Sequence, residues 1–155
     1  MKLPESTEWV LHAAGSLAQL EPGGTASAAQ LAEHFAVPAA YLAKQLQALV
    51  RAGVFTAATG PRGGFRLARP PEQITLLDIV EAVDGRSRFY LCNEIRQRGR
   101  GAAPPEQCRR MCGIAQRMHT AESAWRASLA GVTLADIVAG QPRGVPQRTR
   151  KLLAR

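Results

Sequence analysis

The sequence predicts a mainly helical protein that carries one small β-hairpin. Apolar residues recur at intervals of three and four along most of the chain, which is the period of amphipathic helices. One stretch, residues 54–68, instead places two short runs of strand-forming residues around glycine and proline. The 155 residues are 46% hydrophobic but only 5% aromatic, so we expect a core built largely of Ala, Leu and Val.

Three helices are expected at the start of the chain. The first covers residues 5–20 and is ended by the Pro-Gly pair that follows it. The second covers residues 25–35, with Ser27 as a favourable N-cap. The third covers residues 39–52 after a short turn, and Gly53 supplies its C-terminal stop.

A β-hairpin is expected next, with strands at residues 54–59 and 65–68 on either side of the turn GPRGG. A compact amphipathic helix over residues 75–83 follows it. Two helices joined by a short turn and followed by a hairpin form the order of a winged helix–turn–helix. The sequence therefore predicts such a DNA-binding domain over residues 1–85.

The second expected domain, residues 86–139, combines a loop with a long helix. The loop is rich in Arg, Gly and Pro, and the helix is expected to begin near residues 104–106, because proline and an acid favour a first turn. One apolar stripe runs along this helix and is broad enough to pack against a partner helix in a homodimer. Its members are Met111, Ile114, Met118, Ala121, Trp125 and Leu129.

The chain ends in a short helix and a basic tail. The helix is expected over residues 133–139, and its TLADIV string is similar to TLLDIV at residues 75–80. We interpret that similarity as shared composition and not as a structural repeat. Residues 140–155 have several cations, no acid and no core-forming pattern, so a disordered tail is expected.

The charge and the motifs limit the class of function. Lys and Arg number 20 and Asp and Glu number 12, which gives a formal net charge of +8. Five of the cations and no acid lie in residues 139–155, and a basic tail alone is weak evidence for a nucleic-acid partner. No apolar run is long enough to span a membrane, and the N-terminus does not resemble a secretory signal, so a cytoplasmic location is expected. An enzyme is not expected, because the sequence offers no nucleophile–base pair and no phosphate-binding loop.

The winged helix–turn–helix carries polar and cationic residues where double-stranded DNA would lie. Lysine and arginine suit the phosphates, whereas tyrosine and glutamine suit base edges. The candidate DNA-binding residues are Tyr41, Lys44, Gln45, Arg51, Arg62 and Arg66. Some winged helices bind proteins instead, so the order of elements leaves that alternative open.

Two pairs of potential metal ligands share one spacing. If the long helix begins near residue 104, Cys108 and Cys112 lie four residues apart on one of its faces. Their separation suits two thiolates on one metal better than a direct disulfide. Glu8 and His12 repeat the spacing on the first helix, where a solvated polar face is the alternative. His119 is a rival ligand.

The residues from Tyr41 to Gly85, YLAKQLQALVRAGVFTAATGPRGGFRLARPPEQITLLDIVEAVDG, closely resemble the Rrf-two family of winged-helix transcription regulators, which includes the IscR, NsrR and RsrR types. The cysteine spacing, with EWVLH at residues 8–12 and CNEIRQRG at residues 92–99, is similar to the redox-sensing RsrR type. The resemblance extends to about residue 139.

This resemblance implies a homodimeric regulator, expected to be a repressor, which binds a pseudo-palindromic operator. It also implies a two-iron two-sulfur (2Fe-2S) cluster at the dimer interface, with Cys108 and Cys112 from one chain and Glu8 and His12 from the other. Trp9, between those two, is then expected to couple the redox state to DNA binding. Cys92 becomes a less favoured ligand and a candidate resolving thiol. Zinc at the same ligands and a thiol–disulfide sensor are the alternatives.

Overall fold

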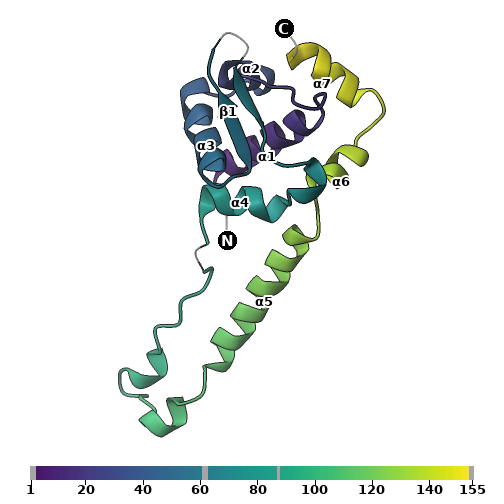
Figure 1. Ribbon diagram of the computed structural model, residues 1–155. Helices are drawn as coiled ribbons and strands as arrows, with labels where there is room; N and C mark the ends of the chain where they lie inside the picture. The colour runs from purple at the N-terminus through teal and green to yellow at the C-terminus, as the bar shows by residue number, and fades with distance from the viewer. Residues whose placement is uncertain (1–2, 61–62, 87, 154–155) are drawn as a thin grey trace. The chain divides into compact units, whose positions relative to one another are not determined.

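The computed structural model describes residues 3–60, 63–86 and 88–153. The chain divides into two compact units. The first, here called the winged-helix unit, contains residues 3–85 and 129–153. The second, here called the cysteine unit, contains residues 86–128. Figure 1 shows the elements of both units, and each unit is described separately below.

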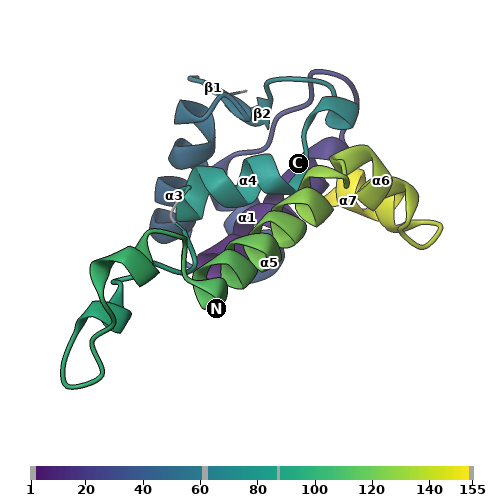
Figure 2. The ribbon, with the colours of Figure 1, turned by 90° about the horizontal axis from the view of Figure 1, so that it is seen from below.

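The winged-helix unit contains six α-helices, one hairpin and a short 3₁₀ helix within its described residues. In chain order they are α1 (Glu5–Ala18), α2 (Ala28–Phe35), α3 (Ala39–Arg51), β1 (Phe55–Ala58), β2 (Gly64–Leu67), η1 (Pro71–Gln73), α4 (Leu76–Asp84), α6 (Leu134–Ala139) and α7 (Val145–Leu153). Figure 2 shows α4 lying across α1, with α6 and α7 near the far end of α1. The predicted fold class, mainly helical with a winged helix–turn–helix, is confirmed.

The helix–turn–helix is fixed by local chemistry at both ends of α2. Ser27 accepts a hydrogen bond from the Gln30 backbone at 3.1 Å, and the Gln30 side chain accepts one from the Ser27 backbone at 2.8 Å. This capping box satisfies two backbone donors that a helix start leaves free. At the other end, Ala36 adopts a left-handed conformation with φ 54°, and α3 begins three residues later.

A single apolar core holds the helices and the hairpin of this unit together. Each helix contributes the residues that share its buried face, in accordance with the helical period. Its fully buried large side chains include Val10, Leu31, Leu42, Leu46, Leu49, Val54, Phe55, Ile74, Ile79 and Leu134.

The wing is a two-stranded antiparallel hairpin in which Phe55 pairs with Leu67 and Thr56 with Arg66. The segment before α2 joins it, because Ala26 and Phe65 exchange backbone hydrogen bonds of 2.8 and 3.0 Å. Gly64 makes this approach possible, since a Cβ atom there would lie 2.7 Å from the Ala26 carbonyl oxygen. The wing is therefore tied directly to the start of α2.

The interpretation of the TLxDIV similarity as composition alone was wrong. Thr75 and Thr133 each form a capping box, with Asp78 and Asp136 respectively. The two helix starts also pair with each other, because Leu76 donates to the Val132 carbonyl and Leu134 donates to the Ile74 carbonyl, each at 2.9 Å. The recurring string thus builds two matching helix starts that face one another.

The expectation of a disordered tail from residue 140 was also wrong. Residues 145–153 form α7, which packs against α2. Thr149 and Leu153 are only 4% and 3% exposed. The sequence pattern is weak because this helix buries a narrow apolar edge and exposes cations elsewhere.

The cysteine unit consists of an extended loop and one long helix. Its loop carries two short 3₁₀ helices, η2 (Ile95–Gln97) and η3 (Pro105–Cys108), and its helix is α5 (Gly113–Ala130). The long helix was expected to begin near residue 104, but the two prolines begin η3 instead. None of the described helices is long and apolar enough to cross a membrane.

Candidate metal centre and nucleic-acid interface

Cys112 occupies the N-cap position of α5. Its carbonyl accepts the first intrahelical hydrogen bond, from Gln116 at 2.9 Å, and its sulfur accepts hydrogen bonds from the backbones of Ala115 and Ile114. These two backbone donors lower the pKa of the Cys112 thiol, and the nearby Arg96 charge acts in the same direction. Cys112 is therefore favoured as a thiolate, which is the form that binds a metal.

Cys108 also lies near Arg96, but it belongs to η3 and not to the long helix as predicted. It is the last residue of η3, so the two cysteines do not lie on one helical face, and it is Cys112 that stands at the helix N-terminus. The hydrogen bond to Glu94 is the main cause that raises the pKa of Arg96, and the charges of both thiols add to it, so both cysteines are within the electrostatic reach of Arg96. The loop thus places both cysteines near Arg96, although the predicted shared helix does not form.

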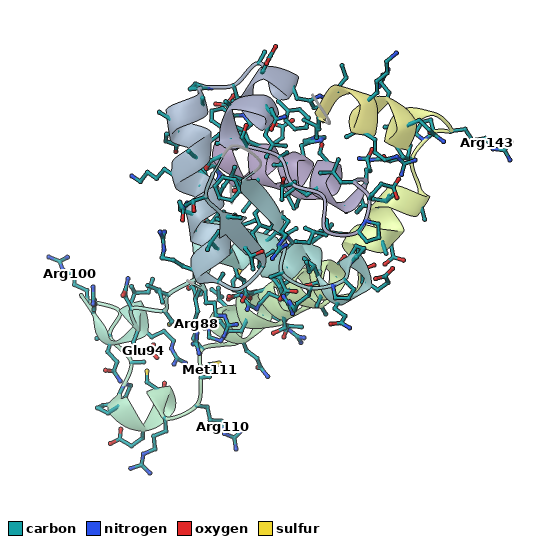
Figure 3. All side chains as sticks on the ribbon, turned by 45° about the horizontal axis from the view of Figure 1, so that its top comes forward. Arg88, Glu94, Arg100, Arg110, Met111 and Arg143 are labelled. Carbon is teal, nitrogen blue, oxygen red and sulfur yellow. The ribbon has the colours of Figure 1, made fainter. Side chains whose placement is uncertain are left out.

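Arg96 organises this loop. Its guanidinium donates to both carboxylate oxygens of Glu94, at 2.5 and 2.7 Å, and to the Arg110 carbonyl at 3.1 Å. The Glu94 pairing lowers the carboxylate pKa, and Glu94 itself adopts a left-handed backbone conformation with φ 48°. Since Arg110 lies between the cysteines in sequence, these contacts fix the segment that carries them. Other arginines, such as Arg100 and Arg110, point outward from the loop (Figure 3).

Glu8 and His12 lie on one side of α1, in the winged-helix unit. Both line an open pocket of about 640 Å³, together with Trp9 and the turn between α2 and α3. The His12 ring lies 5.7 Å from the ring of Phe35, measured between centroids. A carboxylate and an imidazole one helical turn apart are thus available to a ligand that enters this pocket.

Trp9 connects this pocket to the start of α3. Its ring meets the Tyr41 ring edge-on, with centroids 5.5 Å apart. Tyr41 is 46% exposed and stands in the first turn of α3, which is the second helix of the helix–turn–helix. Trp9 and Tyr41 were each predicted as functional residues from the sequence, but no local pattern could predict the contact between their rings.

The candidate DNA-binding residues fall into different positions. Lys44 is exposed and Gln45 half-buried near Tyr41, whereas Arg51 lies about 15 Å further along α3. Arg66 is exposed on β2, where its guanidinium donates to the Thr56 hydroxyl at 3.0 Å. Arg62 lies outside the described residues. The roles of these residues in DNA binding remain predictions.

Among the described residues of either unit, no three His, Cys, Asp or Glu side chains gather as a metal site. Each unit instead offers two of the predicted ligands, Cys108 with Cys112 and Glu8 with His12. Cys92 is exposed and all three cysteines are free. His119 lies about two helical turns beyond Cys112, or about 10 Å along α5.

The apolar stripe of α5 is largely uncovered. Ile114 and Met118 on α5 are 66% and 40% exposed. Met111, predicted as the first member of the stripe, lies before α5 begins and is 62% exposed. The Trp125 ring packs edge-on against Phe89 with centroids 4.6 Å apart. An exposed apolar row on one helix is typical of a surface that packs against another chain.

The fold and these residues define the chain as a winged-helix protein that also carries a cysteine-bearing loop and a long helix. The chain belongs to the Rrf2 family, described as iron-dependent transcriptional regulators, whose model matches residues 3–140. The resemblance noted from the sequence is thus confirmed for the family.

Curated relatives agree with that family. The chain is 41% identical over 80 residues to BadM of Rhodopseudomonas palustris, named as an HTH-type transcriptional regulator, and this match covers 52% of the chain and 51% of BadM. It is 32% identical to the protein aau3 of Rhizobium meliloti over 74% of the chain and 70% of that protein. The matches cover about half the length of the first curated relatives, BadM among them.

Solved structures share the fold. The global cysteine regulator CymR of B. subtilis superposes with a TM-score of 0.70 at 21% identity, over 92% of this chain and 99% of that one. IscR of T. potens superposes with a TM-score of 0.68 at 22% identity, over 93% and 94%. At these identities the similarity establishes the fold.

Proposed function

We propose that this protein is a homodimeric DNA-binding transcription regulator, acting as a repressor, that senses redox state through a 2Fe-2S cluster. Its ligands are Cys108 and Cys112 of one subunit and Glu8 and His12 of the other. The observation that carries the proposal is the position of the Cys112 sulfur at the start of α5, where two backbone donors lower the pKa of its thiol, in a protein whose family is described as iron-dependent.

The donor set fits such a cluster. Two cysteine sulfurs, an imidazole and a carboxylate are all accepted ligands of iron. The backbone donors at the start of α5 stabilise the Cys112 thiolate, and Arg96 balances negative charge beside both cysteines. His12 and Glu8 open together onto one pocket, so a partner's sulfur ligands have space to enter.

A bound 2Fe-2S cluster would supply one-electron redox chemistry. A neutral histidine in place of a third thiolate makes the site less negative, which raises the reduction potential. Arg96 acts in the same direction.

Dimerisation and DNA binding complete the proposal. The exposed apolar row of α5 supplies a self-complementary surface for a twofold partner. A twofold dimer of winged helices predicts a pseudo-palindromic operator, with half-sites separated by one helical turn or a multiple of it. The first turn of α3 and the wing are the elements expected to contact the duplex.

Two alternatives keep the scaffold and change the sensor. Zinc accepts the same four donors, but a zinc protein is colourless, whereas an iron–sulfur protein absorbs visible light and bleaches on reduction. A thiol–disulfide sensor would use Cys92, which is exposed. A visible spectrum of anaerobically purified protein, with iron and sulfide counted per chain, tests the proposal against both. A colourless protein would reject it.

Replacing Arg62 with Ala tests the wing. We expect weaker DNA binding and a smaller salt dependence, because one cation at the hairpin turn would release about one phosphate counterion per chain. The slope of log K against log salt should fall by about 0.9 for each bound chain. An unchanged slope would show that Arg62 does not contact a phosphate.

Replacing Arg96 with Gln tests the environment of the cysteines. We expect the reduction potential to fall by on the order of 60 mV, a tenfold shift for a one-electron couple, because Glu94 loses its counter-charge. Arg100→Gln in the same loop is the matched control, since that side chain points outward (Figure 3). Equal potentials in the Arg96 variant and the wild type would show that Arg96 does not tune the site.

A further inference from the structure

The helix α7 presents a basic face that the proposed redox site does not use. It lies beyond residue 140, where the match to the Rrf2 family model ends. The helix carries three cations and no acid, namely Arg148, Arg150 and Lys151, and Arg143 lies just before it.

The position of α7 is fixed by specific contacts within the winged-helix unit. The Gln30 side chain donates to the Leu153 carbonyl at 3.1 Å, and Arg150 donates to the Gln19 carbonyl at 3.2 Å and lies 3.5 Å from the Glu21 carboxylate. Thr149 and Leu153 are buried beneath the helix. The basic segment is therefore a docked element with one defined face toward solvent.

These contacts place the end of α7 beside the first turn of α2. Gln30 is the third residue of α2 and also closes its capping box with Ser27. In a helix–turn–helix, the first of the two helices crosses the DNA backbone while the second enters the major groove. Figure 1 shows the last turn of α7, α2 and the upper part of the β1–β2 hairpin at the same end of the unit.

The solvent face of α7 is cationic and unpaired. Arg148 and Lys151 are exposed three residues apart, and Lys151 lies on the side opposite Thr149 and Leu153. Gln147 lies one helical turn before Lys151 on the same side. Neither cation pairs with a carboxylate among the described residues. By contrast, Arg150 is committed to Gln19 and Glu21.

We propose that α7 is an additional DNA-binding element, in which Arg148 and Lys151 contact phosphates of the duplex that flanks the segment read by α3. The partner is double-stranded DNA because α7 is docked on the helix that crosses its backbone, and because two unpaired cations match its phosphates. These contacts extend the footprint of each half-site without reading its sequence. The inference rests on the proposed DNA binding and is independent of the cluster.

Salt-dependent binding of a 40-base-pair duplex, selected by the full-length protein from random sequence, tests this inference. For Arg148→Ala combined with Lys151→Ala, the slope of log K against log salt should fall by about 1.8 per chain. For a dimer bound through both chains it should fall by about 3.6, with about tenfold or greater loss of affinity at moderate salt. The variant keeps Thr149, Arg150 and Leu153, so its thermal unfolding should match the wild type.

Two further variants make the test specific. Arg98→Ala combined with Arg100→Ala removes the same charge from exposed positions of the cysteine unit and should leave the slope unchanged. Gln147→Lys adds a cation to the same face of α7 and should steepen the slope by about 0.9 per chain.

The outcomes separate the two proposals. If the wild type binds the duplex but the α7 variants have its slope, or if the control pair lowers the slope equally, α7 does not contact DNA and the regulator proposal stands. If the wild type binds no duplex, both proposals fail.

Discussion

Cys112→Ser is expected to yield a folded, colourless protein with no bound iron or sulfide. Serine is a favourable N-cap, so its hydroxyl can accept the hydrogen bonds that α5 now donates to the Cys112 sulfur. What the substitution removes is the thiolate, on which iron–sulfur ligation depends. We therefore expect complete loss of visible absorption without loss of helix content, measured by absorbance, metal analysis and circular dichroism.

The control for this experiment is Cys92→Ser. Cys92 is exposed and lies outside the proposed ligand set, so its serine variant should keep the colour and about two iron atoms per chain. His12→Cys is a second control, because a thiolate in place of the imidazole should preserve the cluster and lower its potential. If Cys92→Ser lost the cluster while Cys112→Ser kept it, the ligand assignment would be wrong.

Reduction or oxidation of the wild type should change its affinity for the operator by about 5- to 150-fold, the range typical of allosteric coupling. The contact of Trp9 with Tyr41 supplies a direct route between the proposed ligands Glu8 and His12 and the first turn of α3. A shift of the α1 turn that carries those ligands would move Trp9 against Tyr41. In the proposed mechanism, that contact would link the redox state to the position of α3.

Trp9→Ala should remove most of this coupling. We expect the cluster spectrum to persist and the two redox states to bind DNA within about twofold of each other, because the ring that meets Tyr41 is gone. Trp9→Phe keeps an aromatic ring at the contact and should retain part of the response. Fluorescence anisotropy with labelled operator in both redox states measures the effect. An undiminished difference between the states of Trp9→Ala would show that the signal takes another route.

The winged-helix unit was largely predictable because its signals are local. The capping residue Ser27, the buried face of α3 and the glycines of the wing each act within a few residues of sequence. Helical periodicity then assigned most of the core. The similar strings at Thr75 and Thr133 were detected, but their pairing is a tertiary contact between distant segments and could not be predicted from composition.

The cysteine segment and the tail show where local signals fail. Pro104 and Glu106 are good helix-start residues, yet they begin a 3₁₀ turn, and α5 starts later with a cysteine at its N-cap. Cysteine is not among the usual capping residues, so this helix start could not be predicted from local sequence. The helix α7 depends on Gln30, more than a hundred residues away, for one of its contacts. Similarly, nothing in the local sequence distinguishes Arg96 from the other arginines of its loop, because its role depends on its contacts with Glu94 and Arg110.

A mixed dimer tests most directly whether the ligands come from two subunits. One chain carries Cys108→Ser and Cys112→Ser, the other carries His12→Ala, and two affinity tags isolate the dimer that contains both. If the ligands come from different subunits, one site combines the intact cysteines of the second chain with Glu8 and His12 of the first. The account predicts one 2Fe-2S cluster per mixed dimer, half the iron and absorbance of the wild type. A mixed dimer without iron, beside a wild type that binds its cluster, would contradict it.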